Sequence, residues 1–289
     1  MFANTIRPAD RSRRALRRAA VAFTFVAASA FVGPAAGARC ATRDGRPASC
    51  TATRAASAPS VLLIGDSNIF GSLGQSLARR LRARGMRVER FGKPASGLSR
   101  PDFFDWPREG ARLVAATDPD IVIFMVGGND HQRLEAPGGS GTRIRWREMD
   151  RWREEYGRRA IEVADLLHRG GRRVFFLSPT NRAPRIDRED AYRVSRIQEA
   201  ALAGLDDVTW VDMFALTTDR HGHWLDRGVG ADGRWHSYRR PDGIHLTDEG
   251  GELVAEGLLA ILDARGLLEC AEVLAVTQAA SRGGTTATR

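Results

Sequence analysis

A short apolar run near residue 61 constrains the fold of this chain more than any other feature. The run Val61–Ile64 is followed by Gly65-Asp66-Ser67-Asn68. Apolar residues then recur at spacings of three and four, the period of a helix with one buried face, at Phe70, Leu73, Leu77 and Leu81. A short apolar run before such a helix is typical of a strand that is covered on both faces, as in a parallel sheet.

Ser67 therefore lies where a predicted strand turns into a predicted helix. In open α/β sheets, ligands bind at the carboxyl ends of the strands. A hydroxyl at this position also experiences the partial positive charge of a helix N-terminus, which favours a developing anion. The alternative is that Ser67 only caps the helix, since serine is a preferred N-cap residue.

The alternation of strand and helix continues along the chain. Further strands are predicted at 86–91, 121–126, 174–177 and 208–213, and further helices at 107–116, 146–168, 189–205 and 247–265. The last helix is expected to be buried through Leu253, Leu258, Leu259, Ile261 and Leu262. Five alternations predict an α/β fold, a three-layer α/β/α sandwich around a five-stranded parallel sheet, whose strands end at one rim. Residues 214–241 lack periodicity and are expected to form a loop.

The N-terminal segment has the pattern of a signal peptide, which we place at residues 1–38. Six arginines precede the apolar stretch Ala19–Val32, and Ala36-Gly37-Ala38 offers a cleavage site. The stretch is short for a membrane span, although an uncleaved anchor is the alternative. Both interpretations predict a domain outside the cytoplasm, periplasmic or extracellular, with no stable membrane anchor if the signal is cleaved.

The remaining boundaries follow from composition. Residues 39–58 are rich in Ala, Thr, Arg, Ser and Pro and are expected to be a linker, and 59–268 form one domain. Residues 269–289 are a C-terminal tail, expected to be disordered at its end. Cys40 and Cys50 could close a small disulfide loop, which would leave Cys270 unpaired.

The formal charge of +9 raises the question of nucleic-acid binding. Lys93 is the only lysine, so the other basic residues are arginines, and they are spread along the whole chain. A nucleic-acid footprint is instead clustered on one face. We therefore expect no nucleic-acid partner.

The six histidines are the candidate general bases and metal ligands. His221, His223 and His236 lie in a polar stretch with Asp219 and Asp226, but their spacing fits no metal motif. We expect no metal site there.

His245 differs because Asp242 lies three residues before it, in Asp242-Gly243-Ile244-His245. An aspartate and a histidine at this separation in a tight turn can point the same way, so that the carboxylate holds the imidazole in one tautomer. The alternative is a surface aspartate and a capping histidine in an ordinary turn.

Three short motifs follow one another along the chain: Gly65-Asp66-Ser67-Asn68, Gly127-Gly128-Asn129-Asp130 and Asp242-Gly243-Ile244-His245. This combination resembles the SGNH/GDSL hydrolase superfamily over about residues 60–266. The resemblance implies a flavodoxin-like SGNH hydrolase fold. The segment 97–107 resembles that of a bacterial branch of exported SGNH proteins whose substrates are mostly unassigned.

The resemblance also implies roles for individual residues. Ser67 would be the nucleophile, His245 the general base and Asp242 its orienting carboxylate. The oxyanion hole would consist of the backbone N–H groups of Ser67 and Gly97 and the side chain of Asn129. Gly92 is the second candidate for the glycine. No cofactor is implied.

Two features depart from the superfamily pattern. Asn68 replaces the usual leucine after the serine, and the segment 97–107, which carries the candidate oxyanion glycine, is unusually long and aromatic. The aromatic side chains of this segment could line a sugar or acyl pocket, but we favour core packing.

Together these observations predict an exported serine esterase acting through an acyl-enzyme. By resemblance, its substrates would be O-acetyl esters, either small molecules or glycans such as cell-envelope polysaccharide or peptidoglycan. One alternative is an O-acyltransferase with the same triad. Another is a non-catalytic carbohydrate-binding or assembly component. We expect a monomer.

Overall fold

The computed structural model describes residues 58–265 except 142, 186 and 231. All of them belong to one compact unit, Cys50–Arg289. The predicted signal peptide, the linker up to residue 57, the three cysteines and the tail from 269 lie outside the described residues. No helix within the described part of the chain is both long enough and apolar enough to span a membrane.

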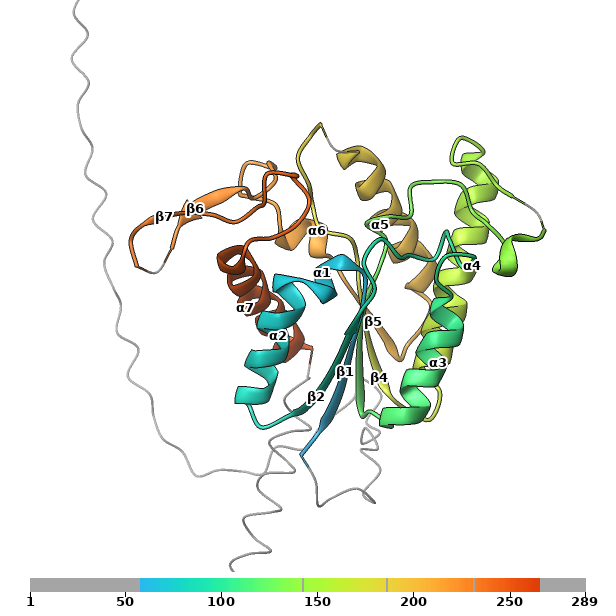
Figure 1. Ribbon diagram of the computed structural model, residues 1–289, viewed down its shortest axis with the longest axis horizontal. Coiled ribbons are helices and arrows are strands. Elements are labelled where there is room, and N and C mark those ends of the chain that lie inside the picture. The colour runs from blue at the N-terminus through green and yellow to red at the C-terminus, as the bar shows by residue number, and fades with distance from the viewer. Residues whose placement is uncertain (1–57, 142, 186, 231, 266–289) are drawn as a thin grey trace, which may run out of the picture. The chain divides into compact units, whose positions relative to one another are not determined.

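A parallel sheet forms the centre of the domain (Figure 1). Its strands are β1 (Ser60–Gly65), β2 (Arg87–Gly92), β3 (Ile121–Met125), β4 (Arg173–Leu177) and β5 (Val208–Val211). They pair in the order β2-β1-β3-β4-β5, and every pair is parallel. The predicted fold class is therefore confirmed.

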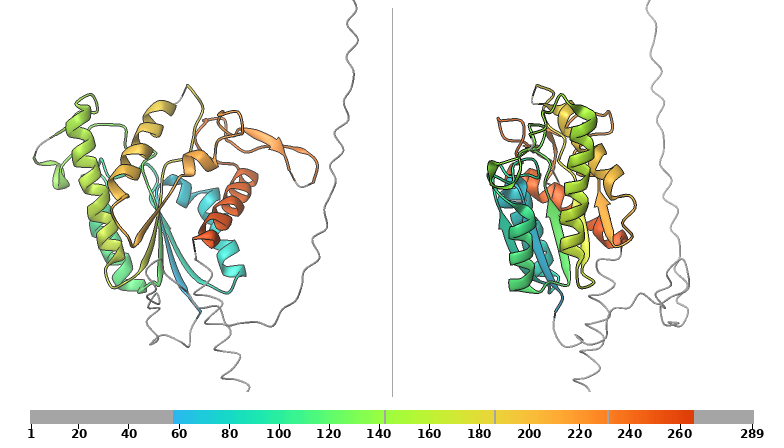
Figure 2. Two further views of the ribbon diagram at one scale, coloured as in Figure 1. Left: turned by 180° about the vertical axis from the view of Figure 1, so that it is seen from behind. Right: turned by 90° about the vertical axis from the view of Figure 1, so that its right-hand side faces the viewer.

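Helices cover both faces of the sheet (Figures 1 and 2). Strand β1 shows why, because alternate residues of a strand point to opposite faces. Val61 and Leu63 belong to one apolar core, with α2 (Ser72–Ala83) and α7 (Asp248–Ala264). Leu62 and Ile64 belong to a second core, formed with α3 (Trp106–Thr117), α4 (Met149–His168) and α5 (Arg188–Leu202). The three layers are those predicted from the sequence.

The first helix differs from the prediction because it is broken at Gly71. A short helix, α1 (Ser67–Phe70), precedes α2, and Gly71 between them has extended backbone angles, φ −86° and ψ −153°. The break changes the phase of the helical face, so Phe70 is 55% exposed, whereas Leu73, Leu77 and Leu81 are buried as expected. Helix α1 also lies close to β2, since a Cβ at Gly92 would be 2.3 Å from the nitrogen of Phe70.

Two other predictions need correction. The stretch 214–241 is not all loop: it contains most of α6 (Met213–Leu216) and a hairpin of β6 (Arg227–Val229) and β7 (Trp235–Ser237). These strands are too short to show a period of two in the sequence. In α7, Leu253 is 41% exposed, whereas Leu258, Leu259 and Leu262 are buried.

The aromatic segment 97–107 contributes mostly to the core. Trp106 is buried at the start of α3, and its ring meets that of Phe104 edge-on at 4.9 Å. Trp106 Nε1 donates to Ser96 Oγ at 3.0 Å, which satisfies the only polar atom of the indole. Phe103 is the exception, half exposed beneath the ammonium of Lys93.

Candidate active site

Ser67, His245 and Asp242 form a hydrogen-bonded chain at the carboxyl rim of the sheet. Ser67 Oγ lies 2.9 Å from His245 Nε2, across 178 residues of sequence. His245 Nδ1 lies 2.8 Å from Asp242 Oδ2. This order, hydroxyl to imidazole to carboxylate, is the arrangement in which an imidazole can remove the hydroxyl proton.

The end of β1 places Ser67. Asp66 N donates to Met125 O of the neighbouring strand at 3.0 Å, which continues the sheet by one residue. Asp66 is also the N-cap of α1, because its carboxylate accepts the N–H of Asn68 at 2.9 Å. The capping role considered for Ser67 is therefore filled by Asp66, and the hydroxyl of Ser67 faces His245 instead.

A tight turn before α7 orients His245. Asp242 Oδ1 accepts the N–H groups of Ile244 and His245, and Gly243 has a left-handed φ of +75°. Burial opposes ionisation of Asp242, but the hydrogen bonds from the His245 ring and from the two backbone N–H groups outweigh it and lower its pKa to about 2. An ionised carboxylate accepts a hydrogen bond from Nδ1, so the ring proton of neutral His245 is on Nδ1. The lone pair of Nε2 is then directed at Ser67.

The predicted oxyanion donors lie at the same rim. Asn129 Nδ2 donates one N–H to Ser96 O at 2.9 Å, so its second N–H is available. Within the described residues, the backbone N–H groups of Ser67 and Gly97 have no protein acceptor.

Of the two candidate glycines, Gly97 is the one that lies beside Asp130, in the motif that follows β3. It is buried, and a Cβ there would lie 2.0 Å from Asp130 Oδ1, so only glycine fits without moving the loop. Gly92 is the last residue of β2, paired with Gly65, and packs against α1. Gly97 stays the predicted donor.

A family model described as protein of unknown function (DUF459) matches residues 60–260. The chain belongs to this family. The sheet topology and the Ser67, His245 and Asp242 geometry are those implied by the resemblance to the SGNH/GDSL hydrolases.

Solved structures with similar architecture include two esterases or lipases. One is a catalytic mutant of an acetylxylan esterase from Geobacillus stearothermophilus, at 17% identity and TM-score 0.49, covering 71% of this chain and 94% of that one. The other is a GDSL-like lipase from Bacteroides thetaiotaomicron, at 13% identity and TM-score 0.47, covering 71% of this chain and 88% of that one. At this low similarity we draw no conclusion about activity from either. No curated protein matches the sequence.

Two buried arginines near the site were not identified from the sequence. Arg239 donates to the carbonyl of Ile244, the residue before His245, at 2.7 Å. Arg182 donates to the carbonyl of Gly128, the residue before Asn129, at 2.8 Å. Both side chains are nearly inaccessible to solvent, and burial lowers the pKa of Arg239 to about 10. Each therefore fixes a loop that carries a site residue, and nothing in their spacing separates them from the many other arginines of the chain.

Asp66 is the most perturbed carboxyl group at the rim. It is 1% exposed, and its Oδ2 has no hydrogen-bond partner within the described part of the chain. Burial raises its pKa to about 6, although hydrogen bonds from Asn68 oppose the shift. Near neutral pH, the ionised form of Asp66 is thus less stable in the folded protein than in the unfolded chain, where water solvates it.

Replacing Asp66 with asparagine should remove one component of the pH dependence of stability. The pKa of Asp66 in the folded state is above the ordinary value of 3.8, so the folded state binds this proton more tightly than the unfolded chain does. Proton binding at Asp66 therefore stabilises the fold at low pH, and this stabilisation is lost as pH rises from about 4 to about 6. The loss in the free energy of unfolding is on the order of 3 kcal/mol. Urea unfolding between pH 4 and 7 should show this loss in the wild type relative to Asp66→Asn. Parallel curves for the two proteins would contradict it.

The histidine-rich stretch is not part of the site. His236 pairs with Asp232 at 2.9 Å, and His223 lies 3.6 Å from Asp219. Across the described residues, no group of three His, Cys, Asp or Glu side chains could hold a metal ion.

Proposed function

We propose that this chain is an exported serine esterase that hydrolyses ester groups through Ser67, His245 and Asp242. The observation that carries the proposal is the 2.9 Å contact between Ser67 Oγ and His245 Nε2, backed by Asp242. The N-terminal sequence pattern supports export.

In the proposed mechanism, His245 Nε2 accepts the hydroxyl proton as Ser67 Oγ attacks the ester carbonyl carbon. The oxyanion that forms is bound by the N–H groups of Ser67 and Gly97 and by the Asn129 amide. When the intermediate collapses, the imidazolium donates its proton to the leaving alcohol, and an acyl group remains on Ser67. A water molecule, deprotonated by His245, then attacks the acyl carbonyl carbon. As the bond from this carbon to Ser67 Oγ breaks, the imidazolium returns the proton to Oγ and the acid is released.

The accessibility of the site supports hydrolysis of esters on a large molecule. The side chains of His245 and Asp242 are 37% and 44% exposed, so the reacting edge faces solvent. An open edge admits an acetyl group projecting from a polysaccharide or peptidoglycan strand, which is the substrate class we propose. It also admits water, whereas acyl transfer to a sugar requires that water be excluded. We therefore favour hydrolysis over the O-acyltransferase alternative.

A fluorophosphonate probe tests the nucleophile directly. We expect the protein to hydrolyse p-nitrophenyl acetate and to lose this activity in proportion to labelling, with one adduct that mass spectrometry of the digested protein locates at Ser67. Absence of both labelling and hydrolysis would favour a non-catalytic carbohydrate-binding role. An adduct at another serine would overturn the assignment of Ser67.

A further inference from the structure

The segment Ser96–Ser99, here called the oxyanion loop, is held on its N–H side by one buried carboxylate. The N–H groups of Leu98 and Ser99 donate to the two oxygens of Asp130 at 3.1 and 2.8 Å. Tyr156 also donates its hydroxyl to Asp130, at 2.8 Å. Asp130 therefore binds the loop and is itself anchored to α4.

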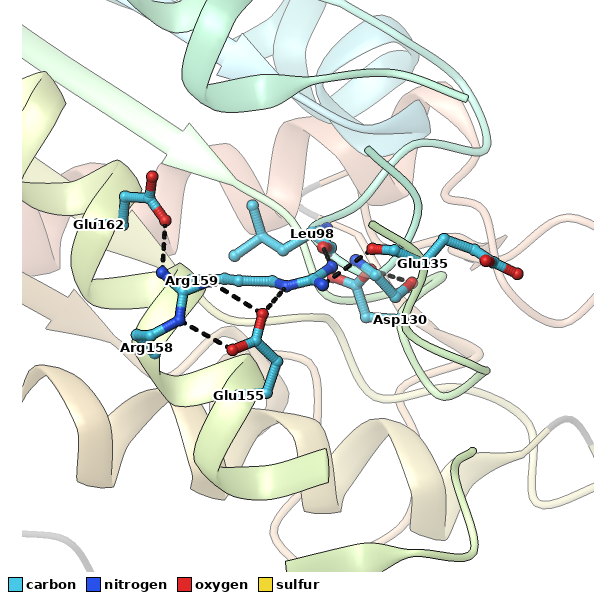
Figure 3. A network of polar contacts seen from close by, with 8 residues as sticks. Leu98, Asp130, Glu135, Glu155, Arg158, Arg159 and Glu162 are labelled. Atoms are coloured by element: carbon cyan, nitrogen blue, oxygen red, sulfur yellow. Dashed lines mark hydrogen bonds and ion pairs between the residues drawn. The ribbon is translucent and has the colours of Figure 1, made fainter. Parts of the chain in front are cut away.

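On its carbonyl side, the oxyanion loop is held by Arg159 of α4 (Figure 3). The guanidinium donates from Nη1 to Leu98 O and from Nη2 to Glu135 O, both at 2.8 Å. Glu135 in turn donates its backbone N–H to Ser99 O at 2.9 Å. One cation thus joins the oxyanion loop to the segment that follows Asn129 and Asp130.

Arg159 is itself fixed in position. Its Nε donates to Glu155 Oε1, one turn earlier in α4, at 2.8 Å, and its side chain is only 12% exposed. Glu155 also receives two hydrogen bonds from Arg158. The hydrogen bond from Arg158 is the main cause that lowers the pKa of Glu155 to about 2, so this carboxylate stays ionised.

We propose that Arg159 is a positioning residue that aims the Gly97 N–H at the oxyanion, an inference that rests on the proposed function. Arg159 touches no reacting atom. It fixes the carbonyl of Leu98 while Asp130 fixes the N–H of the same residue. The Gly97 N–H is one peptide before the Leu98 N–H and two before the peptide that carries the Leu98 carbonyl, so its direction follows from both restraints. Without Arg159, the carbonyl of Leu98 loses its donor and the loop can rotate toward water.

The chain offers a matched control in Arg158. Arg158 binds the same Glu155 and also Glu162, but its side chain is 60% exposed and donates to neither Leu98 nor Glu135. With p-nitrophenyl acetate, Arg159→Ala should lower kcat about 10- to 100-fold with KM nearly unchanged, because misdirected donors cost transition-state binding. Arg158→Ala should leave both constants near the wild-type values.

Chemical rescue separates positioning from general damage to the fold. Arg159 lines a cavity of about 380 Å³, so guanidinium ion can reach the vacated position. Millimolar guanidinium should restore part of kcat in Arg159→Ala and none in Arg158→Ala. A loss of kcat that is equal in the two variants, or one that guanidinium does not relieve, would overturn the proposal.

Amide hydrogen exchange tests the same inference without relying on activity. Peptides covering residues 96–99 should exchange faster in Arg159→Ala than in Arg158→Ala, since only the former frees the oxyanion loop. Unchanged exchange in Arg159→Ala overturns the positioning role even if activity falls. If Arg159→Ala exchanges faster but the wild-type protein hydrolyses no ester, Arg159 still restrains the oxyanion loop. The proposed function, and with it the link between this restraint and catalysis, would then be refuted.

Discussion

Replacing Ser67 with alanine is expected to lower the hydrolysis of p-nitrophenyl acetate by at least about 10³-fold. Alanine lacks the oxygen that attacks the ester, and His245 then has no hydroxyl proton to accept. Residual rate would come from the oxyanion donors, which remain in place. The N-cap of α1 is Asp66, so the variant keeps its cap and should unfold at nearly the wild-type temperature.

Ser72→Ala is the appropriate control for this experiment. Ser72 lies five positions later, at the start of α2, and its hydroxyl donates to Asp248 Oδ1 at 2.7 Å rather than to His245. Its loss should cost about 1 kcal/mol of stability and no activity. Esterase activity that survives Ser67→Ala would show that another group is the nucleophile.

The second large effect is expected for Asp242→Asn, with a loss in kcat of about 10⁴-fold. The asparagine oxygen can still accept the N–H groups of Ile244 and His245, so the turn should persist. Its amide nitrogen, however, is a donor, and it would face His245 Nδ1 only if the ring proton moved to Nε2. His245 would then present a proton to Ser67 instead of a lone pair. Steady-state kinetics with purified protein measures the loss.

A similar turn elsewhere in the chain supplies the control. Asp219 Oδ1 accepts the N–H groups of His221 and His223, and its other oxygen lies 3.6 Å from His223 Nδ1. Asp219→Asn should therefore perturb the same kind of turn with no effect on hydrolysis. If Asp242→Asn also retained near-normal kcat, Asp242 would not be the carboxylate that sets the tautomer of His245.

The layers of the fold could be predicted because buried strands and amphipathic helices leave periodic signals. Leu73, Leu77 and Leu81 follow such a period and are buried. Phe70 follows it too but is exposed, because the period does not reveal that the backbone at Gly71 is extended. The β6–β7 hairpin was missed for a related reason, since strands of three residues are too short to alternate.

The residues brought together at the site were predictable where they belong to short motifs at strand ends. Ser67, Asn129 and the pair Asp242 and His245 are such residues. Arg159 was not predictable, because its contact with Leu98 spans 61 positions and depends on how α4 packs. Asp130 belongs to the motif Gly127-Gly128-Asn129-Asp130, but its role in holding the oxyanion loop depends on the same packing.

The separation of Ser67 and His245 in the sequence has a consequence for how the protein is made. Ser67 follows the first strand, whereas His245 immediately precedes α7, which packs against α2 and receives a hydrogen bond from Ser72. A chain that is still emerging from the ribosome contains Ser67, the proposed nucleophile, long before it contains His245, the proposed base. If the two residues act as proposed, a chain that has not yet reached His245 cannot hydrolyse an ester.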